Sequence, residues 1–96
     1  MKTIHKYEVP MPPETTKIEL PIGSQILSLR YVHMDRGLYL WAEVPACLTV
    51  EREVREFRAF KTGDGIPSPD IYIATAIDQH QPEVYHLYEV LKGEPE

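Results

Sequence analysis

The side chains best suited to binding are two aromatic residues spaced for one face of a β-strand. Tyr39 and Trp41 lie two residues apart in an alternating run, so a strand would place both rings on the same side. Tyr and Trp are frequent anchors at binding surfaces because each combines a large rigid apolar surface with a polar group. The pair is therefore either an open platform or part of a core covered by a second sheet.

Cations and a glycine loop supply the other candidate ligand-binding residues. Arg30, on the preceding strand, could stack on the aromatic platform or pair with Glu43, and Arg58 could neutralise a phosphate. Gly63-Asp64-Gly65 is either a flexible turn, which is the common use of glycine, or a loop whose backbone N–H groups hold an anion. The candidate ligand-binding residues are therefore Arg30, Tyr39, Trp41, Arg58, Gly63 and Gly65.

No pattern in the chain indicates catalysis or metal binding. The common nucleotide-loop, dinucleotide, zinc, calcium and serine-hydrolase motifs are absent. The four His residues lack metal-ligand spacing, and His5 and His86 would be neighbours only if the first and last strands pair. Cys47 has no local base and is expected to be a small, buried or half-buried apolar residue. We expect a non-enzymatic protein without catalytic residues, metal or cofactor.

Composition narrows the class of protein. The 96 residues, 43% hydrophobic and 26% charged, predict one globular domain spanning residues 1–96. No apolar run approaches the roughly 18 residues of a membrane span, and the first residues do not resemble a signal peptide, so no membrane association is expected. The formal net charge is −5 and most cations stand beside acids, which argues against general nucleic-acid binding.

Proline placement and period-two alternation predict an all-β fold. The nine Pro residues fall between apolar alternating runs, and these runs predict strands at 3–9, 17–20, 25–33, 38–44, 70–77 and 83–91. Residues 50–60 fit either a helix with ion pairs four residues apart or a strand, and we favour a strand over 55–61. The expectation is a six- to seven-stranded antiparallel sandwich or barrel, with at most one short helix near 50–58 and a polar tail at 92–96.

A hairpin at the centre of this fold is predicted between residues 25 and 44. Met34–Gly37 looks like a tight loop that Gly37 closes in the left-handed conformation. The returning strand, 38–44, is apolar on both faces, so we expect it to be central and covered on both sides. Such strands carry more apolar surface than one small sandwich covers, which predicts a homo-oligomer, most simply a dimer.

Several segments, in order, resemble a group of small proteins of unknown function encoded by phages and prophages. The segments that carry the resemblance are Met1–Glu8, Ile18–Pro21, Ile26–Ser28, Leu38–Ala42 and His86–Val90. The resemblance implies a phage origin and a bacterial host cytoplasm, with which the lone Cys agrees. It brings no catalytic residues.

Two functions are compatible with these features. The first is a bacterial anti-defence binder that sequesters a nucleotide second messenger in a pocket between subunits, with aromatic residues for the base and Arg residues for the phosphates. The alternative is an inhibitor or adaptor that binds a host or phage protein, or a minor structural phage protein. The acidic charge favours a protein partner.

Overall fold

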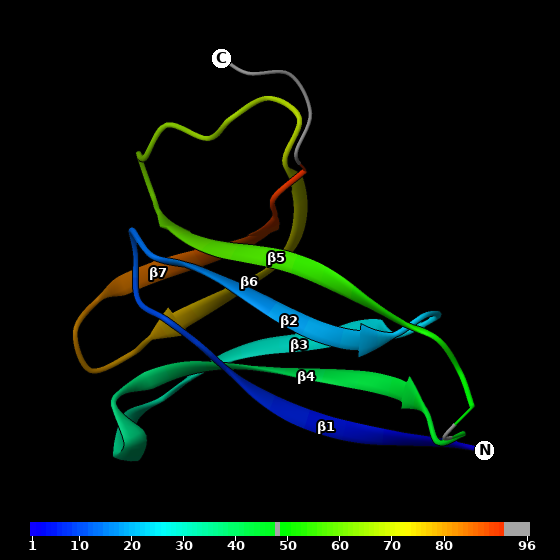
Figure 1. Ribbon diagram of the computed structural model, residues 1–96. Helices are drawn as coiled ribbons and strands as arrows, with labels where there is room; N and C mark the ends of the chain where they lie inside the picture. The colour runs from blue at the N-terminus through cyan, green and yellow to red at the C-terminus, as the bar shows by residue number, and fades with distance from the viewer. Residues whose placement is uncertain (48, 92–96) are drawn as a thin grey trace.

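The chain forms two antiparallel β-sheets packed face to face, as the computed structural model shows for residues 1–47 and 49–91 (Figure 1). The first sheet has the strand order β1-β4-β3, and the second has the order β2-β5-β7-β6. The described strands are β1 (Lys2–Val9), β2 (Thr15–Pro21), β3 (Gln25–Val32), β4 (Gly37–Pro45), β5 (Arg52–Lys61), β6 (Ile71–Asp78) and β7 (Glu83–Glu89). The sheets do not close into a barrel, so the all-β prediction is confirmed as a sandwich. The predicted tail at 92–96 lies outside the described residues.

The ambiguous segment, residues 50–60, is a strand and contains no helix. β5 runs from Arg52 to Lys61 between β2 and β7, which hydrogen-bond to its two edges. Burial of Phe57 and Ala59 in the core stabilises the strand further, in addition to the two hydrogen-bonded ladders. Ion pairs four residues apart would stabilise a helix by only about 0.2–0.5 kcal/mol each. The strand favoured over 55–61 is therefore confirmed, and the alternative of a short helix near 50–58 is wrong, because pairing on both edges outweighs that local preference.

The core lies between the sheets and is centred on β4. Alternate residues of β4, from Leu38 to Val44, are 0–1% exposed. Tyr31 of β3 stacks on Tyr85 of β7, with ring centroids 6.0 Å apart, and so links the two layers. The buried residues of the second sheet that face this row are Ile18, Leu20, Phe57, Ala59, Ala76, Tyr85 and Leu87.

The hairpin between β3 and β4 differs from the predicted one in its turn. A single 3-10 turn, η1 (His33–Asp35), leads into Arg36, which has a positive φ of 52° and donates its N–H to the His33 carbonyl. Gly37 is instead the buried first residue of β4 and pairs with Val32. The prediction that Gly37 closes the loop was wrong, since the turn begins one residue earlier and Arg36 takes the left-handed position.

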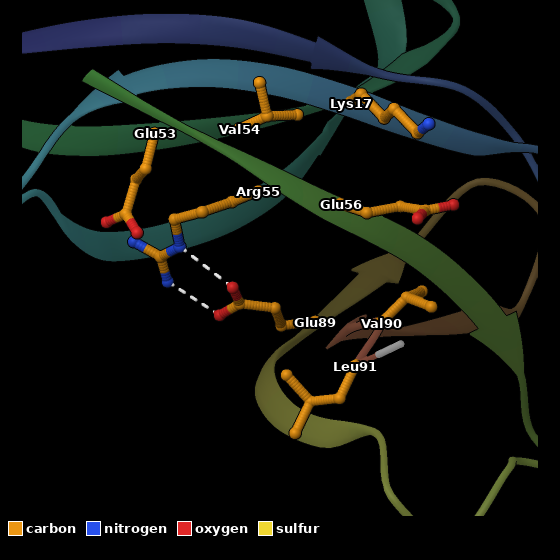
Figure 2. Close-up of a pocket in the computed structure, with 8 residues that line it drawn as sticks. All are labelled: Lys17, Glu53, Val54, Arg55, Glu56, Glu89, Val90 and Leu91. Atoms are coloured by element: carbon orange, nitrogen blue, oxygen red, sulfur yellow. Dashed lines mark hydrogen bonds and ion pairs between the residues drawn. The ribbon is translucent and has the colours of Figure 1, made fainter. Parts of the chain in front are cut away.

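A half-buried ion pair ties β5 to β7 near one end of the second sheet. Arg55 donates two hydrogen bonds to the Glu89 carboxylate, at 3.0 and 2.7 Å (Figure 2). It donates a third to the Ser24 carbonyl at 3.1 Å. Ser24 belongs to the turn between β2 and β3, which connects the two sheets. The side chains of the pair are only 17% and 18% exposed, and the hydrogen bonds to Glu89 raise the pKa of Arg55.

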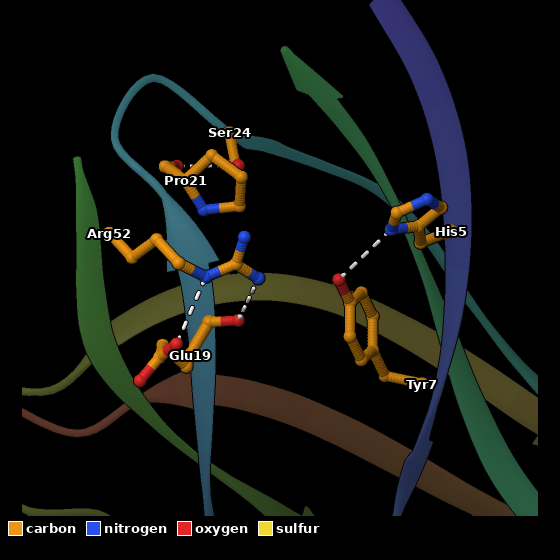
Figure 3. A network of polar contacts seen from close by, with 6 residues as sticks. All are labelled: His5, Tyr7, Glu19, Pro21, Ser24 and Arg52. Carbon is orange, nitrogen blue, oxygen red and sulfur yellow. Dashed lines mark hydrogen bonds and ion pairs between the residues drawn. The ribbon is translucent and has the colours of Figure 1, made fainter. Parts of the chain in front are cut away.

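A second Arg–Glu pair, between Arg52 and Glu19, is exposed. Arg52 Nε donates to Glu19 Oε1 at 3.0 Å, and the two side chains are 53% and 65% exposed (Figure 3). Water solvates these charges when the pair opens, so an exposed pair adds little to stability.

We predict that Glu89→Ala lowers the free energy of unfolding by about 1–3 kcal/mol, because it leaves the half-buried Arg55 guanidinium without its partner. Glu19→Ala, the matched control, should cost less than about 1 kcal/mol because Arg52 is exposed. Urea unfolding of both variants measures the difference. Equal costs would contradict the structural role given to the Arg55–Glu89 pair.

Candidate binding surface

Three of the six predicted binding residues lie together on the outer face of the first sheet. In the strand register, Trp41 of β4 pairs with Lys6 of β1, and Tyr39 lies between Glu8 of β1 and Arg30 of β3. These side chains alternate with the buried row of β4 and therefore point away from the second sheet. We call Lys6, Arg30, Tyr39 and Trp41 the aromatic face.

Tyr39 and Trp41 are half-buried, so the pair is neither a fully open platform nor part of a covered core. Both rings have intermediate exposure, while Lys6 and Arg30 beside them are exposed. In the described part of the chain the second sheet covers only the inner face of β4. The prediction of a central hairpin is confirmed for β4 only, because β3 is an edge strand of the first sheet. Coverage of both faces within one chain was wrong, because a two-layer sandwich provides each sheet with one covering layer.

Charges of both signs surround the aromatic rings. The Lys6 ammonium lies 4.6 Å from the centroid of the Tyr39 ring, a cation–π contact. Partial burial raises the pKa of Tyr39, and the negative charges of Asp35 and Glu8 raise it further. Cations and acids thus alternate around a partly apolar centre.

The alternative pairing of Arg30 with Glu43 is not formed. Glu43 instead pairs with Lys2 of β1, at 3.2 Å. In the register of β3 and β4, Arg30 stands opposite Tyr39, whereas Glu43 stands opposite Gln25. Arg30 is therefore left beside the aromatic pair, where a ligand can reach it.

The other three predicted residues belong to the second sheet. Arg58 lies on β5, with its guanidinium 4.5 Å from the centroid of the Phe60 ring. Gly63 has a positive φ of 97°, and both Gly63 and Gly65 face open space in the connection between β5 and β6. The structure therefore does not bring the six residues into one site. The turn interpretation accounts for Gly63, whose φ is positive, whereas Gly65 follows the turn without a positive φ.

The histidines form contacts that the sequence did not indicate. His5 and His86 lie in different sheets, since β1 pairs with β4 and β7 lies between β5 and β6, so they are not neighbours. His33 and His80 instead stack, with ring centroids 3.8 Å apart, where the loops after β3 and β6 meet. Among the described residues, no three His, Cys, Asp or Glu side chains gather as a metal site requires.

Cys47 is exposed, which corrects the expectation of a buried or half-buried residue. Cys47 follows the end of β4 at Pro45, outside the strands whose alternate side chains fill the core. Its sulfur lies 2.9 Å from the Thr49 hydroxyl, and this hydrogen bond lowers the pKa of the thiol below its usual value. The thiol borders a shallow hollow of about 250 Å³ that also touches His5 and Arg52.

Two larger hollows open on the surface, and neither is lined by Tyr39 or Trp41. One, of about 510 Å³, lies beside the Arg55–Glu89 pair (Figure 2). The other, of about 390 Å³, runs between β3 and β6 and includes Arg30. Of the aromatic face, only Arg30 borders a hollow, and the two aromatic rings lie on a sheet surface and not in a pocket.

Fold and surface together define a small antiparallel β-sandwich with an open aromatic sheet face. A domain of unknown function, DUF7352, matches residues 1–96, and the chain belongs to this family. No curated protein and no solved structure matches the chain. Across the described residues, no helix has the length and apolar character needed to cross a membrane.

Because Leu40 is buried and Trp41 is half-exposed, we predict that Leu40→Ala lowers the unfolding free energy more than Trp41→Ala does. Leu40→Ala removes a fully buried side chain and should cost about 2–5 kcal/mol of unfolding free energy. Trp41→Ala should cost less, about half of the roughly 3–5 kcal/mol expected for truncating a fully buried Trp, because one side of the ring is open. Urea unfolding tests this order. A Trp41→Ala cost as large as that of Leu40→Ala would place Trp41 in the core.

The hydrogen bond from Thr49 predicts a reactive thiol. A lowered pKa increases the thiolate fraction below the usual titration range, so Cys47 should be alkylated by iodoacetamide faster than a free thiol at neutral pH. Thr49→Ala should return the midpoint of the rate against pH toward the ordinary thiol value. An unchanged midpoint in this variant would contradict the assigned cause.

Proposed function

We propose that this protein is a non-enzymatic binding protein that recognises a protein partner through the aromatic face. The observation that carries the proposal is the placement of Tyr39 and Trp41, side by side and half-exposed, at the centre of a sheet face. Partly exposed Tyr and Trp side chains are typical anchors of protein interfaces, because they bury a large area and lose little conformational freedom.

The shape of the face supports a macromolecular partner. Binding sites for small molecules are concave and enclose most of the ligand, whereas protein interfaces are commonly broad surfaces with an apolar centre and a polar rim. Ile4, which is 56% exposed and paired with Glu43, extends the apolar centre along β1. Lys6, Glu8 and Arg30 supply a rim of both signs. A partner with a complementary mixed rim fits this arrangement.

A second copy of the chain is one such partner, which retains the prediction of a homodimer. Two copies related by a two-fold axis would bury their apolar centres against each other. The neighbouring Lys6 and Glu8 give each copy charges of both signs to pair across the axis.

A nucleotide ligand is the second candidate, favoured by the cations beside the rings. A base could stack on Trp41 or Tyr39, with its phosphates near Lys6 and Arg30. Two aromatic faces meeting in a dimer would enclose such a ligand more fully than one. The neighbouring acid Glu8 opposes phosphate binding, and we therefore rank this function second.

The resemblance to phage and prophage proteins suggests where the protein would act. In that setting the protein would act in the bacterial cytoplasm as an anti-defence factor. Its partner would be a host or phage protein, or, in the second function, the nucleotide signal of a defence system.

We predict that Trp41→Glu abolishes partner binding while leaving the fold intact, since it puts a charge at the apolar centre of the face. Val54→Glu is the matched control, because Val54 is an exposed apolar residue of β5 in the second sheet, at 62% exposure, and belongs to neither proposed site. Affinity capture from bacterial extracts and light scattering of the purified proteins measure hetero- and self-association. A partner or dimer that is lost in Trp41→Glu and kept in Val54→Glu is the expected result.

Equal association by all three proteins would contradict the proposed face. Titration of cyclic dinucleotides against the Trp41 fluorescence separates the second function from the first. Quenching by a nucleotide that is abolished in Arg30→Ala protein, which keeps Trp41 as the fluorophore, would favour the nucleotide.

A further inference from the structure

One edge strand of the first sheet, β3, lies beside one edge strand of the second sheet, β6, and each has a free backbone edge. β3 hydrogen-bonds only to β4, and β6 hydrogen-bonds only to β7. β3 and β6 nevertheless lie close together along the same side of the sandwich. In the described chain no backbone ladder joins them, so each presents unpaired N–H and C=O groups toward the space between.

A groove of about 390 Å³ occupies this space, and its lining shows that strand edges border it. The lining includes the consecutive runs 27–31 of β3 and 74–77 of β6. Side chains of a strand alternate between its two faces, so a hollow on a face would be lined by every second residue. Consecutive residues meet one hollow where the edge of the strand borders it. Backbone groups of both strands are therefore accessible from the groove.

The β6 edge lacks most of the features that protect natural sheet edges from pairing. Residues 71–77 contain no charged side chain and no Pro, although a bulge interrupts the register with β7 between Tyr72 and Ala74. Leu27 and Ile77, at 45% and 60% exposure, both line the groove. This combination of an uncharged edge and exposed aliphatic side chains is typical of a site that accepts another strand.

The groove contains one charge. Arg30 is the only charged residue among those that line it, and its exposed guanidinium forms no ion pair with any described residue. An unpaired cation in an otherwise uncharged groove is complementary to a carboxylate. A guanidinium can hold a carboxylate through two parallel hydrogen bonds, which would fix the register of the bound segment.

We propose that this groove binds an extended peptide segment of a partner protein, which adds as a strand to the free edge of β6. Aliphatic side chains of the segment contact Leu27 and Ile77, and an acidic side chain of the segment pairs with Arg30. This site goes beyond the aromatic face, because it requires neither Tyr39 nor Trp41.

The test uses synthetic eight-residue peptides of alternating Val and Thr with one central Asp, blocked at both ends. Titration into the isotopically labelled protein should shift the backbone amide resonances of 27–31 and 74–77 and slow hydrogen exchange along β6. A matched peptide with Lys in place of Asp should bind at least about tenfold more weakly, because it loses the ion pair with Arg30. A peptide N-methylated at alternate residues should not bind, since it cannot form the ladder.

Protein variants complete the test. Arg30→Glu should reverse the preference in favour of the Lys peptide, whereas Arg36→Glu, in the exposed hairpin turn, should leave it unchanged. Trp41→Glu should bind the Asp peptide as the unaltered protein does, which separates this site from the aromatic face. The proposal is overturned by any of three results: no shifts at millimolar peptide, equal binding of the Asp and Lys peptides, or shifts confined to Lys6, Tyr39 and Trp41.

Discussion

The alternation of β4 between a buried row and a half-exposed row is the constraint on which the rest of the structure depends. Leu38, Leu40 and Val44 fill the centre of the space between the sheets, and each contributes about 1.5–3 kcal/mol by leaving water. A shift of one residue in the register would bury the opposite row, including Glu43, and expose the aliphatic one. The energy of the core therefore fixes Tyr39 and Trp41 on the outside.

A two-layer sandwich leaves each sheet with an outer face and with free edges. The aromatic face is the outer face of the first sheet, and the proposed groove lies along the free edge of β6. Arg30 belongs to both, because it stands opposite Tyr39 in the register and also lines the groove between β3 and β6. One partner could therefore place a folded surface on the aromatic face and an extended segment in the groove, with Arg30 between them. Net acidity does not conflict with this, since recognition depends on where the few cations lie.

Local sequence determined which residues form strands and which of their side chains share a face. Period-two alternation with Pro at the boundaries located every described strand except β5, whose residues fitted a helix or a strand, and it placed Tyr39 and Trp41 on one side of β4. It could not assign strands to sheets, because pairing between distant segments leaves no local signal. For that reason Arg58 was grouped with Arg30 although they lie in different sheets, and the stack of His33 on His80 was missed.

The central claim, that Trp41 is open in the free protein, is tested most directly by acrylamide quenching of its fluorescence. Trp41 is the only Trp, so the signal reports this position alone. At protein concentrations low enough to dissociate a dimer, the account predicts quenching between that of a buried Trp and that of the urea-unfolded chain. Quenching should fall when a partner or a second copy covers the face. Quenching as weak as that of a core Trp in the dilute, unpartnered protein would contradict the account.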